Sequence, residues 1–70
     1  MKYYFIKFYE NGKLCSVMGQ PEQEKAKAIL RVTSYLLTVR GAGFEVEQDR
    51  PDCFTYDRYG TTCTVRIEEE

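Results

Sequence analysis

The chain has few residues of the kinds that carry out chemistry, and their spacing matches no complete motif. It contains no histidine and three cysteines, Cys15, Cys53 and Cys63. Their wide separations exclude the paired-cysteine spacing of zinc sites and redox motifs. The absence of histidine removes the commonest general base and metal ligand. We therefore predict no catalytic residues, no metal site and no cofactor, and expect that the protein is not an enzyme.

Acidic residues crowd into one stretch and are the remaining candidates for acid–base chemistry. They are Glu45, Glu47, Asp49, Asp52 and Asp57. Catalysis or hard-cation binding would require two or three of them to converge in a pocket, and their spacing matches no calcium loop. A solvated acidic surface is the expected state. A small enzyme built on these carboxylates or on Cys53 is the weakest of the functional hypotheses.

Charge is distributed unevenly along the chain. Residues 1–40 carry seven basic and three acidic side chains, whereas residues 41–70 carry three basic and eight acidic ones, for a net charge of −1. This balance lacks the overall basic character of a nucleic-acid-binding protein. This distribution fits either two solvated faces or a dipolar molecule that is steered toward a charged partner or pairs head to tail with itself.

Two apolar runs, 3–9 and 14–18, predict an N-terminal hairpin around Asn11-Gly12. An Asn-Gly pair suits a type I′ turn because both central residues need positive φ. A regular two-residue loop places Phe8 opposite Cys15 and Ile6 opposite Val17. The core face would then hold Tyr4, Ile6, Phe8, Cys15 and Val17, and the outer face Tyr3, Phe5, Lys7, Tyr9, Leu14, Ser16 and Met18.

A helix is predicted from Pro21 to about Val39 or Arg40. Proline suits a first helical turn, Glu22 and Glu24 complement the positive helix end, and Gly41-Ala42-Gly43 stops the helix. Its apolar arc is wider than one sheet face can cover. The arc centres on Ala26, Ile29, Val32, Leu36 and Val39, flanked by Leu30 and Leu37 on one edge and by Ala28 and Tyr35 on the other. The flanking leucines pack either on the sheet edges or against a second copy of the helix. Lys25, Lys27 and Arg31 form a cationic stripe that is either solvated or in contact with phosphates.

The remaining residues predict further strands. A short strand at 44–47 precedes a turn at 49–52, and strands at about 53–57 and 62–67 flank Tyr59-Gly60. In this hairpin Tyr56 opposes Cys63 and Phe54 opposes Val65. Cys53 falls on the outer face and is expected to be the reactive thiol, whereas Cys15 and Cys63 face the core. The Glu68-Glu69-Glu70 tail is expected to be frayed.

These elements predict residues 1–70 to be a single small α+β domain. Its order is ββαβββ, or ββαββ without the short strand, and one helix packs on an antiparallel sheet in two layers. No apolar run is long enough for a signal peptide or a membrane span. We expect a cytoplasmic protein with reduced thiols that does not bind membranes.

The outer face of the first hairpin is the predicted interaction surface. Large contiguous apolar areas usually mark interfaces, and Tyr and Met are favoured there. The interface residues would be Tyr3, Phe5, Lys7, Tyr9, Leu14 and Met18. We expect a non-enzymatic protein-interaction module, a homodimer or other homo-oligomer. Alternatively, the aromatics only stabilise the hairpin, or are covered by the tail, or they stack on nucleic-acid bases while Lys2, Lys7, Lys27 and Arg31 contact phosphates.

Overall fold

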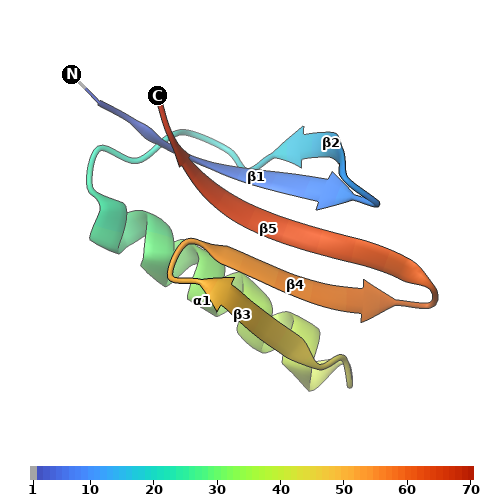
Figure 1. The fold of residues 1–70 in the computed structure, drawn as a ribbon. Coiled ribbons are helices and arrows are strands. Elements are labelled where there is room, and N and C mark those ends of the chain that lie inside the picture. Colours follow the sequence, from blue (N-terminus) through green and yellow to red (C-terminus); the bar gives the residue numbers. More distant parts are fainter. Residues whose placement is uncertain (1) are drawn as a thin grey trace.

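A computed structural model describes residues 2–70 and shows one helix packed on a five-stranded antiparallel sheet (Figure 1). The elements, in chain order, are β1 (Tyr4–Glu10), β2 (Lys13–Val17), α1 (Lys25–Gly41), β3 (Val46–Arg50), β4 (Cys53–Arg58) and β5 (Thr61–Glu69). The strand order across the sheet is β2-β1-β5-β4-β3. The predicted two-layer α+β fold and its ββαβββ order are confirmed. Among the described residues, no helix has the length and apolar character needed to cross a membrane.

Both predicted hairpin turns form where the glycines allow positive φ. Asn11 and Gly12 have φ of 49° and 84°, and Tyr59 and Gly60 have φ of 51° and 89°. These values fit a type I′ turn, whose twist matches that of the flanking strands. In the second hairpin Tyr56 pairs with Cys63 and Phe54 with Val65, as the sequence predicts.

The predicted register of the first hairpin is wrong beyond Leu14 because β2 contains a bulge. Tyr9 pairs with Leu14, but Phe8 pairs with Ser16 and Lys7 with Val17. Cys15 is the extra residue that has no partner. A bulge of this kind places every later side chain on the face opposite to the one that a regular register would give. Val17 therefore lies on the outer face beside Lys7.

The same shift moves Met18 from the predicted outer face to the core side. Its N–H donates to the carbonyl of Ile6 at 2.8 Å, and its side chain packs against the buried cluster. Met18 is therefore not on the outer face where the predicted interface was placed, contrary to the predicted register. Cys15, expected to be buried, is exposed.

The helix begins at Lys25 rather than at Pro21. Glu22 and Tyr4 exchange backbone hydrogen bonds of 2.7 and 2.9 Å, so this segment is extended and continues along β1 beyond the end of β2. Arg31 holds the segment against the helix by donating to the carbonyl of Gln20 and to the carboxylate of Glu22, both at 2.8 Å. Pairing with a strand has overridden the local preference of proline for a first helical turn.

Strand β3 starts later than predicted and ends at Arg50, which pairs with Cys53 around Pro51 and Asp52. Phe44 precedes the strand and packs on the core with its ring 6.2 Å from that of Tyr56. The predicted frayed tail is also wrong. Strand β5 extends to Glu69, and Tyr3 and Glu70 exchange backbone hydrogen bonds of 2.8 and 2.9 Å. The segments around Tyr3 and Glu70 consequently lie side by side (Figure 1).

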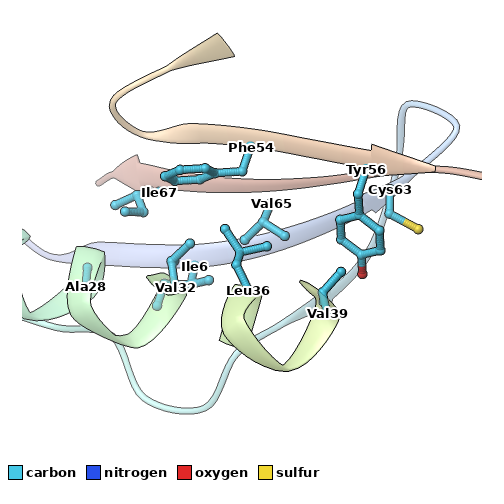
Figure 2. Packing of buried hydrophobic residues seen from close by; sticks show 10 residues of the cluster. All are labelled: Ile6, Ala28, Val32, Leu36, Val39, Phe54, Tyr56, Cys63, Val65 and Ile67. Carbon is cyan, nitrogen blue, oxygen red and sulfur yellow. The ribbon is translucent and has the colours of Figure 1, made fainter. Parts of the chain in front are cut away.

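The core lies between α1 and the middle strands (Figure 2). Its buried members are Ile6, Ala28, Val32, Leu36, Val39, Phe54, Tyr56, Cys63, Val65 and Ile67. The helix buries the Ala28 edge of its apolar arc rather than the opposite edge. Tyr35 lies on the Ala28 edge, where its ring contacts Phe8 at 5.1 Å and its hydroxyl is 2.9 Å from that of Tyr56. Leu30 and Leu37 on the far edge are therefore 66% and 61% exposed, not buried by the sheet.

Truncating Ile6 tests the position of the core. Ile6 is 2% exposed between α1 and the sheet. Ile6→Ala is expected to lower the free energy of unfolding by about 2–5 kcal/mol because it removes buried methyl groups and leaves a cavity. Urea denaturation measures this change. The exposed Leu37→Ala is the control, with an expected change within about 0.5 kcal/mol; equal losses in both variants would contradict this core.

Candidate functional site

The outer face of the sheet carries an apolar patch over β1 and β2, which we call the outer patch. It consists of Phe5, Tyr9, Leu14 and Val17 around Lys7. Opposed residues in an antiparallel pair lie on the same face, so the pairs Tyr9–Leu14 and Lys7–Val17 share this side of the sheet. Leu14 and Val17 are 53% and 43% exposed, whereas Phe5 and Tyr9 are half-buried.

The structure keeps most of the predicted interface residues together. Phe5, Lys7, Tyr9 and Leu14 lie on this face, and Tyr3 precedes β1 with its side chain half-buried. Met18 leaves the set and Val17 replaces it. No sequence signal pointed to Val17, because the Asn-Gly turn by itself predicts a regular register.

Strand β5 and the residue after it, Glu70, supply the polar partners of the outer patch. The ammonium of Lys7 pairs with Glu68 at 3.3 Å and also with Glu70, and the Tyr9 hydroxyl donates to Glu68. The Arg66 guanidinium lies 5.3 Å from the centre of the Tyr9 ring. The last strand therefore flanks the aromatics and covers part of them, as one of the alternative hypotheses anticipated for the tail.

These contacts shift the ionisation of the groups that make them. The hydrogen bond from Tyr9 lowers the pKa of Glu68, Lys7 acts in the same direction, and partial burial opposes both. The hydrogen bond to Glu70 raises the pKa of Lys7, and the bond to Glu68 raises the pKa of Tyr9. At neutral pH the two cations Lys7 and Arg66 lie beside the two anions Glu68 and Glu70. The charges next to the outer patch therefore balance within one molecule.

The basic residues considered for nucleic-acid binding do not gather on one surface. Lys7 lies on the outer face, whereas Lys27 and Arg31 belong to the helix in the other layer. Each has an acidic neighbour within the chain: Lys27 pairs with Glu24 at 3.3 Å and Arg31 with Glu22 at 2.8 Å. Lys2 approaches Glu69 at 3.8 Å.

Three of the residues considered as candidates for catalysis, Asp49, Asp52 and Cys53, line a hollow of about 410 Å³ near the β3–β4 turn. Asp49, Asp52 and Glu68 face it together with Arg50 and Arg66, and Cys53 forms part of its wall. Cys53 is on the predicted outer face but is buried there, contrary to the expectation that it is the reactive thiol. Among residues 2–70, no group of three or more Cys, Asp or Glu side chains is arranged to hold a metal ion.

A smaller cavity of about 190 Å³ opens at one end of the core. Its lining includes Phe8, Cys15, Tyr35, Tyr56 and Cys63. Although Cys15 is exposed, partial desolvation by the surrounding atoms is the main influence that raises the pKa of its thiol, and the hydrogen bond with Glu10 adds to it. Its volume is below the roughly 300–1,000 Å³ typical of small-molecule sites.

The chain matches no protein-family model, and comparisons with curated proteins and with solved structures found no match.

The Glu68 contacts predict a specific dependence of stability on pH. Because its folded-state pKa lies below the ordinary value of 4.5, Glu68 stabilises the fold above that pH, and this contribution is lost as the pH falls through the lowered pKa. Glu68→Gln should lower the free energy of unfolding at neutral pH, and its difference from the unaltered chain should shrink in acid. Urea denaturation from neutral pH to about pH 3 measures this. A difference in the free energy of unfolding that stays constant with pH would contradict the role given to Glu68. Glu47→Gln, on the same face of the sheet, is the control.

Thiol labelling tests the revised placement of the cysteines. Cys15 is exposed, whereas Cys53 and Cys63 are buried. A small thiol reagent is expected to modify Cys15 first in the folded protein, and all three cysteines only after denaturation. Peptide mass mapping identifies the site. Preferential modification of Cys53 would show that the turn beside it opens readily.

Proposed function

We propose that this chain is a non-enzymatic protein-interaction module that self-associates through the outer patch. The observation that carries the proposal is the exposure of Leu14 and Val17 on one face, next to the half-buried rings of Phe5 and Tyr9. Contiguous exposed apolar area of this kind is typical of interaction surfaces. Aromatic residues are also enriched in the centres of interfaces.

The charge balance of the outer patch favours a second copy of the chain as the partner. In a two-fold dimer the same surface meets itself, so a patch with unpaired charge would repel its copy. Lys7 has a side chain only 17% exposed and is paired with Glu68 and Glu70. The apolar surface can therefore be buried without leaving that lysine unpaired, which would be costly.

The two edges of the sheet favour face-to-face contact over extension of the sheet. Three of the five residues of β3 are charged, namely Glu47, Asp49 and Arg50, and such side chains discourage strand addition. Strand β2 has only Lys13 as a charged residue, but its bulge at Cys15 interrupts a regular edge. The proposed contact therefore uses the outer face of β1 and β2.

The alternative of nucleic-acid binding by the same aromatics receives less support. Glu68 and Glu70 lie next to Lys7 and Tyr9, where they would repel phosphates. The other basic candidates belong to different surfaces. A cytoplasmic location remains part of the proposal, and it is supported by Cys15, Cys53 and Cys63 being free thiols.

The decisive experiment compares the mass in solution of the chain and two double variants. Light scattering after size exclusion should give a dimer for the unaltered chain. Leu14→Asp with Val17→Asp should weaken dimerisation at least tenfold, about 1.4 kcal/mol, because it places charges in the apolar contact. Both side chains are exposed, so the folded monomer should persist, as circular dichroism would show.

The matched control is Leu30→Asp with Leu37→Asp, which changes two leucines in the other layer that are more exposed than Leu14 and Val17. This variant should remain dimeric. A monomeric mass for the unaltered chain at high micromolar concentration would overturn the proposal. Loss of the dimer in the helix variant alone would move the interface to α1.

A further inference from the structure

The outward side of α1 carries a second, chemically different surface. Figure 1 shows the helix as an outer layer with the sheet on one side only. Ala26, Leu30, Thr33 and Leu37 are exposed on the side away from the core, and we call this line of residues the helix seam. The spacing of four, three and four residues places them on one narrow stripe of a helix.

The helix seam is set in a positively charged surface. From Lys25 to Gly41 the helix contains Lys25, Lys27, Arg31 and Arg40 and no acidic residue. Among the described residues, Lys25 and Arg40 have no ion-pair partner within the 4.0 Å limit of an ion pair. The Lys27–Glu24 pair is about two-thirds exposed on both sides, so it is weak and easily exchanged. An anionic partner is therefore favoured here.

The narrow apolar width of the helix seam indicates which kind of partner can bind there. Within the helix seam Thr33 lies between Leu30 and Leu37. The exposed polar residues Ser34 and Thr38 flank the seam on one side and Arg40 flanks it on the other, so the exposed apolar stripe is about one side chain wide. Such a stripe fits the knobs-into-holes packing of a partner helix, whereas a membrane-bound helix needs a broad apolar face. A second copy of α1 is disfavoured because an antiparallel pair would bring Lys27 toward Arg40 of its neighbour.

We infer that the helix seam binds an amphipathic helix of a different protein, with apolar residues facing Leu30 and Leu37 and acidic residues beside Lys27 and Arg40. This surface is independent of the outer patch, which lies on the opposite side of the sheet. The acidic flanks of the partner supply charge complementarity, and burial of the two exposed leucines supplies the apolar contribution to binding. Binding should therefore weaken as salt is added.

Titration with designed peptides tests this inference. The probe is a three-heptad peptide with leucine at the a and d positions and glutamate at e and g; the comparison peptide carries lysine at e and g. Amide NMR spectra should show shifts concentrated on residues 26–41 with the acidic peptide. Affinity for the lysine peptide should be at least tenfold lower.

Variants of the protein locate the contact. Leu30→Asp and Leu37→Asp should each reduce binding of the acidic peptide at least tenfold, whereas Leu14→Asp with Val17→Asp should leave it unchanged. The second result separates this inference from the proposed self-association. No helix shifts at millimolar acidic peptide, or equal binding of both peptides, would overturn it. Binding to vesicles that contain phosphatidylserine but not to the acidic peptide would overturn it in favour of a lipid surface.

Discussion

The pairing of β1 with β5 is the interaction on which the rest of the structure depends. It joins Tyr4–Glu10 to Cys63–Glu69 across almost the whole chain and places these strands at the middle of the sheet. Ile6, Val65 and Ile67 from the two strands form the floor on which α1 packs (Figure 2). The same pairing brings Glu68 beside Lys7 and Tyr9, so the neutrality of the outer patch is a consequence of this contact. Without it, the first hairpin would carry an unpaired lysine among its aromatics.

Two layers give the molecule two outward surfaces with different charge. Lys7 of the outer patch is paired with Glu68 and Glu70, whereas the exposed side of α1 is cationic and only partly neutralised by Glu22 and Glu24. Paired charge suits contact with an identical surface, and unpaired positive charge suits an acidic one. The uneven distribution of charge along the sequence thus becomes a difference between surfaces. Part of this uneven charge is neutralised within the molecule, because β5 places its acidic residues beside the basic N-terminal strand.

Most residues of the candidate site could be predicted from local sequence patterns, but the complete set could not. Phe5, Tyr9 and Leu14 follow from alternation around the Asn-Gly turn, and the structure keeps them on one face. The bulge at Cys15 places Val17 on the outer face instead of Met18, and no residue type in β2 predicts this bulge. A bulge depends on how the strand fits its neighbours and the core. Here Met18 hydrogen-bonds to Ile6 and packs on the core, which an unbulged strand would not allow.

The sequence by itself determined the elements, their order and both hairpin turns, because these depend on periodicity and on residues that tolerate positive φ. It also indicated that one helix could not bury its whole apolar arc. Only the tertiary structure decided which edge of that arc is buried, where the helix begins, and that the acidic tail is a strand. Each of these outcomes depends on a contact between segments far apart in the chain: Tyr35 with Phe8, Glu22 with Tyr4, and Glu70 with Tyr3. Local propensity amounts to a fraction of a kcal/mol per residue, and such long-range contacts outweigh it.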